Sequence, residues 1–202
     1  MNRKKIIYVI SAPSGTGKTT ICNKILAEDK ELKLSISYTS RPAKKGEQNG
    51  IDYYFVSNSE FEKMIEDNAF VEWANVYGNY YGTPWKAFDE LEKSDNDILL
   101  EIDVQGGKSI IDKYPSAVLI FILPPSIEEL RKRLVLRGRD DSDEINRRID
   151  IVKKEIEYMK YYDYIVVNDN LEVAKEQVLS VVRSERLKST VLFEYYKKFF
   201  QG

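Results

Sequence analysis

Four short apolar runs recur along the chain, and the segments between them carry apolar residues at helical spacing. The runs are IIYVIS (6–11), DILLEID (97–103), AVLIFIL (117–123) and YIVV (164–167). Continuous apolar runs of this length, with helices between them, indicate strands that are buried on both faces of a parallel sheet. The pattern therefore predicts an α/β fold whose parallel sheet is flanked by helices.

Helix signals occupy the intervals between these runs. Residues 18–28 carry apolar side chains on one face, and residues 145–159 carry an apolar stripe at alternating spacings of four and three. The SIEE segment at 126–129 forms a capping box, and Asn170 is a good N-cap for a helix that runs to about Leu187. We expect the aromatic tail FEYYKKFFQG to pack as a terminal helix.

Two stretches do not follow this alternation. Residues 35–83 are rich in Tyr, Ser, Thr, Gly and Asn, with strand-like pieces around the helical segment SEFEKMIED, which predicts a small α+β insertion. Residues 137–144, RGRDDSDE, have no apolar anchor and are expected to be mobile. The predicted division is a core (1–34, 84–125 and 155–202), the insertion (35–83) and a lid region (126–154).

Composition narrows the possible chemistry. The chain has 202 residues, which suits one compact domain with insertions. Its net charge of -2 provides no broad field for nucleic acid or anionic lipid, so neither is an expected partner and any anion binding must be local. Histidine is absent, which excludes histidine-dependent nucleophile activation, acid/base steps and metal ligation.

The cysteine content and the hydropathy of the chain indicate the cellular compartment in which the protein is expected. Cys22 is the only cysteine, so the chain forms no internal disulfide, as suits a reducing interior, and it is expected to be a small core residue. No apolar run approaches the roughly 20 residues of a transmembrane helix. The short run Ile6 to Ile10 reads as a strand rather than as a signal peptide, and the expected location is cytoplasmic.

A glycine-rich stretch follows the first predicted strand. APSGTGKTT, residues 12–20, matches the phosphate-binding pattern G-x-x-x-x-G-K-[ST] except that Ala12 replaces the first glycine. In such a loop, backbone N–H groups surround the phosphates at a helix N-terminus, a lysine reaches the β/γ oxygens and a Ser/Thr hydroxyl binds Mg²⁺. A methyl group at position 12 is acceptable if φ is negative. The candidate ATP-binding residues here are Ala12, Pro13, Ser14, Gly15, Thr16, Gly17, Lys18, Thr19 and Thr20.

Longer segments then resemble one family. The segments are SISYTSRPAKKGEQNGIDYYFV, FVEWANVYGNYYGTPW, EIDVQG, PPSIEELRKRL, RGRDDSDEINRRI and YDYIVVNDN. In their order they resemble the guanylate kinase family from residue 6 to about 187. The resemblance implies a P-loop NTPase core with a GMP-binding insertion and a mobile lid.

The resemblance places the guanine base in the insertion. Glu72 would accept from N1 and N2 of the base, while Ser37 and Thr83 would donate toward O6. Guanine presents N–H donors beside an O6 acceptor, so a carboxylate next to a hydroxyl suits it. Adenine would leave the carboxylate unpaired, and mismatches of this kind cost roughly 10⁴-fold in other hydrogen-bonding sites.

The resemblance also places the acceptor phosphate. Arg41, Tyr53 and Tyr81 match the family's phosphate-binding positions. The family usually reads T-R-x-P-R-x-G-E, whereas this chain reads TSRPAKKGE, so Lys44 replaces the second arginine. Lysine is a point charge and forms no bidentate fork, so we expect weaker phosphate binding through Lys44.

A second departure lies in EIDVQG, where the family usually has D-I-D-x-Q-G. Glu101 therefore occupies a GMP-binding position near the base with a longer side chain than usual. Asp103 is retained for a Mg²⁺ and water network, with Thr19 as the direct ligand. The implied cofactor is Mg²⁺, bound with ATP.

The charged segment matches the family's lid. Arg137 and Arg148 match catalytic arginines that close over the transferred phosphoryl group. The resemblance further assigns Arg133, Asn168 and Asp169 to the ATP site.

The implied reaction is MgATP + GMP → ADP + GDP, with dGMP as an expected second acceptor. Catalysis would rest on alignment and on charge neutralisation by Lys18, Arg41, Arg137 and Arg148, without a general base. Two alternatives stay open, namely a P-loop kinase for another small acceptor and a non-catalytic phosphopeptide-binding module. The expected partners are ATP and GMP, and the expected assembly is a monomer or a homodimer.

Overall fold

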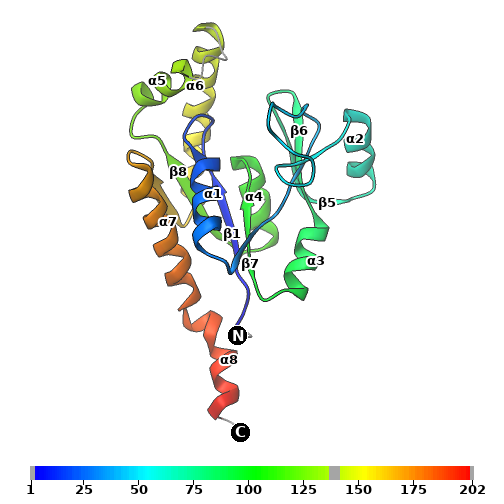
Figure 1. Ribbon diagram of the computed structural model, residues 1–202, viewed down its shortest axis with the longest axis vertical. Coiled ribbons are helices and arrows are strands. Elements are labelled where there is room, and N and C mark those ends of the chain that lie inside the picture. Colours follow the sequence, from blue (N-terminus) through cyan, green and yellow to red (C-terminus); the bar gives the residue numbers. More distant parts are fainter. Residues whose placement is uncertain (1–2, 137–141, 201–202) are drawn as a thin grey trace.

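The computed structural model describes residues 3–136 and 142–200 (Figure 1). Its core is a five-stranded parallel sheet in the order β2-β7-β1-β8-β9. The strands are β1 (Ile7–Ser11), β2 (Leu32–Leu34), β7 (Asp97–Glu101), β8 (Val118–Leu123) and β9 (Tyr164–Val167). The predicted parallel sheet is confirmed, and the three-residue edge strand β2 was not predicted.

Helices cover both faces of this sheet. Alternate residues of a strand point to opposite faces, so Tyr8 belongs to the apolar cluster beneath α1 (Lys18–Glu28) and α7 (Leu171–Arg186). Val9 belongs to the opposite cluster, beneath α3 (Trp85–Lys93) and α4 (Val104–Lys113). Asp103 is the N-cap of α4, and its carboxylate accepts a hydrogen bond from the Gly106 N–H at 2.8 Å.

A second sheet forms the predicted α+β insertion. Its strand order is β4-β3-β6-β5, and β5 and β6 form an antiparallel hairpin. The elements are β3 (Tyr38–Thr39), β4 (Tyr54–Phe55), α2 (Asn58–Glu66), β5 (Phe70–Val76) and β6 (Asn79–Pro84). Figure 1 shows this second sheet to one side of the core, while α5 and α6 lie above the core sheet.

The described part of the lid region is mostly helical. It contains α5 (Ile127–Leu136) and most of α6 (Ser142–Ile156), which share an apolar cluster, and the 3₁₀ helix η1 (Glu157–Tyr161) follows α6. Of the segment expected to be mobile, residues 137–141 lie outside the described residues. Residues 142–144 form the first turn of α6, where acidic residues stabilise a helix N-terminus, and the expected mobility of this segment stays a prediction.

The chain ends in the predicted helix α8 (Ser189–Phe200), which extends beyond α7 (Figure 1). Val191 is the only buried residue among those of α8 whose side chains the structure describes. None of the helices in the described part of the chain is long and apolar enough to cross a bilayer.

Asp97 links three distant segments at the other end of the sheet. Its fully buried carboxylate accepts hydrogen bonds from both terminal nitrogens of Arg3 at 2.6 Å and from Arg186 Nε at 2.7 Å. The Ile6 N–H also donates to it, at 2.9 Å. A single carboxylate thus joins the N-terminal segment, β7 and α7.

Candidate active site

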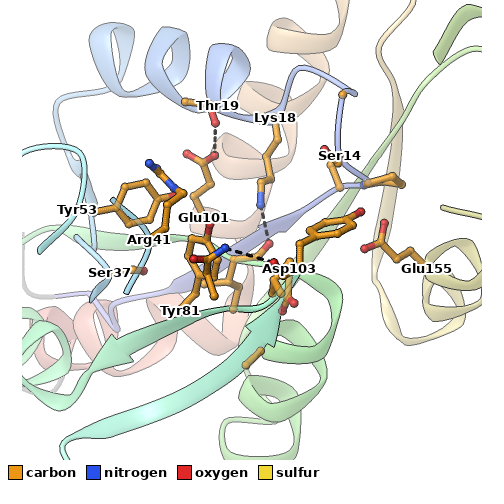
Figure 2. Close-up of a pocket in the computed structure, with 18 of the residues that line it drawn as sticks. Ser14, Lys18, Thr19, Ser37, Arg41, Tyr53, Tyr81, Glu101, Asp103 and Glu155 are labelled. Atoms are coloured by element: carbon orange, nitrogen blue, oxygen red, sulfur yellow. Dashed lines mark hydrogen bonds between the residues drawn. The ribbon is translucent and has the colours of Figure 1, made fainter. Parts of the chain in front are cut away.

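A cavity of about 450 Å³ opens where β1 and β7 end, between the P-loop, the second sheet and α6 (Figure 2). Ligands of open α/β sheets bind at the carboxyl ends of the strands. The cavity brings together most of the residues predicted from the sequence. These are Ala12, Pro13, Ser14, Gly15, Gly17, Lys18, Thr19, Thr20, Ser37, Arg41, Lys44, Tyr53, Glu72, Tyr81, Glu101, Asp103 and Arg148.

The P-loop connects β1 to α1 and has the backbone that the motif requires. Gly17 has φ 96°, and a Cβ atom at this position would lie 2.7 Å from Nδ2 of Asn168. Of the non-glycine residues in the described ranges, only Asn68 and Tyr77 have positive φ, so Ala12 meets the condition of a negative φ. Lys18 Nζ donates to the Ile102 carbonyl at 2.8 Å, which holds the ammonium group at the end of β7.

Thr19 lies beside a carboxylate. Its hydroxyl donates a hydrogen bond to Glu101 Oε1 at 2.5 Å (Figure 2). The described residues contain no cluster of three or more His, Cys, Asp or Glu side chains that would hold a metal by itself. A hydroxyl with one nearby carboxylate fits Mg²⁺, which takes few protein ligands and keeps waters and substrate phosphate oxygens.

Glu72 forms a buried acceptor at the other end of the cavity. It lies on β5 opposite Thr83 of β6, and the Thr83 hydroxyl donates to its Oε1 at 2.5 Å. Only 6% of Glu72 is exposed. Burial, together with the Asp103 carboxylate, raises the pKa of Glu72 to about 7. Glu72 Oε2 and Asp103 Oδ1 both lie within 4 Å of the point where a Cβ atom on Gly106 would stand, so Asp103 is an acidic neighbour of this site.

Arg41 is held by a residue that the sequence reasoning missed. Its guanidinium donates to both carboxylate oxygens of Glu47, at 2.7 and 3.0 Å, and lies 5.2 Å from the centre of the Tyr53 ring. The ion pair lowers the pKa of Glu47. The Lys44 N–H donates to the same carboxylate at 2.7 Å, and the Tyr53 and Tyr81 rings lie 5.9 Å apart. The signal available in the sequence was the acidic residue in TSRPAKKGE, six positions after the arginine.

Helix α6 contributes two cavity residues. Arg148 lies 5.6 Å from the centre of the Tyr77 ring, and its Nε donates to Glu144 at 3.4 Å. Glu155, which was not predicted, also lines the cavity, and burial, together with the Asp103 charge, raises its pKa to about 7. Arg137 lies outside the described residues.

Three further predicted residues, Thr16, Arg133 and Asn168, do not line the cavity but stabilise the P-loop. Arg133 donates to the backbone carbonyl of Asn168 at 3.0 Å, and Asn168 Nδ2 donates to the Thr16 carbonyl at 2.7 Å. The buried Thr16 hydroxyl donates to the Pro13 carbonyl at 2.7 Å. Asp169 is exposed, and the structure does not bring it into this cavity.

Comparison with known proteins gives one consistent result. The profile of the family described as guanylate kinase matches residues 4–185. The chain is 47% identical over 188 residues to a guanylate kinase of Syntrophomonas wolfei, covering 93% of this chain and 96% of that protein. It is 46% identical over 194 residues to a guanylate kinase of Geobacter metallireducens, covering 96% of each chain. A crystal structure of guanylate kinase from Anaplasma phagocytophilum superimposes with a TM-score of 0.77 at 34% identity, covering 93% of this chain and 89% of that one.

Proposed function

The chain belongs to the guanylate kinase family, and we propose that it transfers the γ-phosphoryl group of MgATP to GMP, or to dGMP, to give ADP and GDP. One observation carries the proposal beyond the family match. The P-loop and the buried Glu72 carboxylate line the same cavity, so a phosphate donor and a base-selected acceptor can be bound at once.

In the acceptor site, we assign guanine to the Glu72 end of the cavity. The carboxylate would accept from N1 and N2, and Ser37 would donate to O6. The position of Asp103 near Glu72 supports a role for Asp103 at the base, where the sequence had suggested Glu101. Arg41, Tyr53 and Tyr81 would hold the GMP phosphate with Lys44, and Glu47 would orient Arg41.

In the donor site, the P-loop would bind the phosphates of ATP, and Lys18 would neutralise charge on the β and γ oxygens. Thr19 would hold Mg²⁺, and the nearby Glu101 carboxylate would accept a hydrogen bond from a water on the ion. The sequence had suggested Asp103 for this role. When bound, Mg²⁺ supplies positive charge to the phosphate oxygens. Arg133 and Asn168 would act by holding the P-loop.

The proposed catalysis is alignment and charge neutralisation inside a closed cavity. A GMP phosphate oxygen is already anionic near neutral pH, so no general base is required. Lys18 and Arg148 approach the cavity from the P-loop and from α6, whereas Arg41 approaches it from the insertion, so the three cations surround the space between donor and acceptor. Arg137, from the lid region, is the third proposed arginine after Arg41 and Arg148. We infer action on free nucleotides in the cytoplasm, as a monomer or a homodimer.

The test is ADP release with MgATP, comparing GMP with AMP, UMP and CMP, and with Lys18→Ala as the catalytic blank. Turnover with GMP alone, lost in the Lys18 variant, is the expected result. Turnover with another acceptor would overturn the assignment of the Glu72 site. Tight GMP binding without turnover would favour the non-catalytic binding module. For a kinase, ATP at 100 times its Kd is expected to stabilise the fold by about 2.7 kcal/mol in a Mg²⁺-dependent way. The absence of this stabilisation would also favour the binding module.

A further inference from the structure

The insertion and the lid helix meet at Tyr77. This residue stands in the turn between β5 and β6, and its ring lines the same cavity as Arg148 and Glu155 of α6. The Arg148 guanidinium lies 5.6 Å from the ring centre, within the range of a cation–π interaction. Burial, together with the Glu155 carboxylate, raises the pKa of Tyr77 to about 12, so the phenol is neutral at physiological pH.

The turn that presents this ring is strained. Tyr77 and Gly78 are the two residues of the turn, with φ of 52° and 79°, which is a type I′ hairpin. The first position of such a turn favours Asn or Asp, because a short polar side chain tolerates left-handed backbone, whereas an aromatic residue rarely adopts it. Asn75 and Asn79 stabilise the turn: the Gly78 N–H donates to Asn75 Oδ1 at 3.1 Å, and Asn79 Nδ2 donates to the Tyr77 carbonyl at 3.3 Å.

A tyrosine in left-handed backbone lowers the stability of the fold, which suggests that its side chain has a function. Strain of this kind persists where the surrounding structure fixes the backbone, and it is concentrated at active sites and switch regions. The ring does not enter the apolar core of the insertion, since 44% of the residue is exposed. Its ring contacts Arg148, which belongs to the lid region and not to the sheet that carries Tyr77.

We propose that Tyr77 is a positioning residue: its ring orients Arg148 toward the phosphates and couples the insertion to helix α6. The inference rests on the proposed function, because it assumes that Arg148 neutralises the transferred phosphoryl group. The ring restricts the guanidinium from one face, while Glu144 holds Nε at 3.4 Å.

The decisive variant is Tyr77→Asn, because asparagine suits left-handed backbone and removes the ring. We expect the Tm to rise by about 1–3 °C as the strain is relieved. We expect kcat to fall about 3- to 10-fold as the cation–π contact is lost, with the KM for GMP changed less than about 2-fold. Tyr77→Phe keeps the ring face and should keep kcat within about 2-fold of the wild type. Trp73→Leu, an exposed aromatic on β5 outside the cavity, is the matched control for kcat.

A double-variant cycle identifies the partner. In an Arg148→Ala background, Tyr77→Asn should lower kcat by no more than about 2-fold, because the residue it positions is gone. An unchanged kcat in the single variant Tyr77→Asn would overturn the proposal. So would a fall in kcat that is as large in the Arg148→Ala background as in the wild type. An absence of GMP turnover in the wild type would overturn the proposed function itself, and an Arg148→Ala variant with full activity would overturn the role of Arg148 on which the inference depends.

Discussion

The Thr83 hydroxyl donates its hydrogen bond to Glu72 Oε1 across the β5–β6 hairpin, at 2.5 Å. A hydroxyl has one proton to donate. While Glu72 accepts that proton, Thr83 has none for guanine O6, so Thr83 serves to orient the buried carboxylate. Ser37, which is buried at the cavity wall, is then the hydroxyl free to face O6.

We therefore expect Thr83→Val to raise the KM for GMP by about 10-fold, since hydrogen bonds to charged groups contribute about 1.5–3 kcal/mol. Valine keeps the shape of threonine and removes the donor. The KM for ATP should not change, because the P-loop is at the other end of the cavity. Steady-state kinetics with each substrate varied provide the measurement, and Thr190→Val, exposed on α8, is the control. An equal rise in both KM values would contradict this assignment.

GMP affinity should depend on pH through Glu72, whose pKa is about 7. Protonation replaces an acceptor with an O–H donor, so affinity should fall as the pH is lowered through about 7. Calorimetric titration at several pH values measures this, and in Glu72→Gln the dependence should vanish, apart from that of the GMP phosphate, whose second pKa is about 6. The variant is needed for the assignment because Glu155 also has a pKa of about 7.

The same pKa shift has the opposite sign for stability. A carboxyl group whose folded-state pKa is raised favours folding in its protonated form. Its contribution is complete below the unfolded value and is lost as the pH rises through about 7. Nucleotide-free protein should therefore lose this contribution over the pH interval in which GMP binding improves, and chemical denaturation of wild type and Glu72→Gln would show whether it does.

Glu47→Gln should raise the KM for GMP by about 5- to 10-fold, because Arg41 loses a bidentate, charge-assisted partner. Both terminal nitrogens of Arg41 currently bond to Glu47. Binding of the guanosine nucleoside, which lacks the phosphate, should be unchanged. A loss of nucleoside affinity of the same size would show that the variant damages the base site as well.

Lys44→Arg should lower the KM for GMP, because arginine offers a fork to phosphate where lysine offers a point charge. Lys44 lines the cavity on the same loop as Arg41. Kinetics with GMP varied at saturating ATP are the measurement. A KM that is unchanged or higher would refute the idea that this departure weakens phosphate binding.

Asp97→Ala should destabilise the fold by about 3–5 kcal/mol, since it removes the buried carboxylate that Arg3 and Arg186 share. Among the described residues, Arg186 would keep only Asp29 as a close acidic partner, and Arg3 only the exposed Glu31. Arg3 and Arg186 both donate to Asp97, whose side chain is fully buried. Equilibrium denaturation measures the change. Glu31→Ala is the control from the same cluster, because the Glu31 side chain is 67% exposed and should matter by less than about 1 kcal/mol.

The apolar runs identified the buried strands of the core because a strand covered on both faces has no polar positions. The three-residue edge strand β2 is too short to show that signature. The starts of α3 and α4 were not predicted either, because α3 follows β6 directly and α4 begins three residues after the end of β7. Propensity over such short segments does not separate a strand end from a helix start.

In the site, the roles of Glu101 and Asp103 could not be predicted from the sequence motif, because they depend on the direction of each side chain. Glu101 and Asp103 are two residues apart, a spacing that puts side chains on one face of a strand. Here β7 ends at Glu101, and Asp103 is already the N-cap of α4, so the first reaches Thr19 while the second lies toward Glu72. The Glu47–Arg41 pair likewise depends on the path of a loop, which no periodicity encodes.

Because Cys22 is buried in α1, its rate of alkylation reports on the local opening of the fold. Its thiol is fully buried, burial raises its pKa, and no other cysteine competes for reagent. Alkylation therefore requires the packing of α1 against the sheet to open, so the labelling rate measures the free energy of that opening, as amide exchange does for backbone groups. Because α1 carries the P-loop at its N-terminus, ATP should slow the labelling in proportion to its occupancy, and nucleotide affinity becomes readable without any turnover.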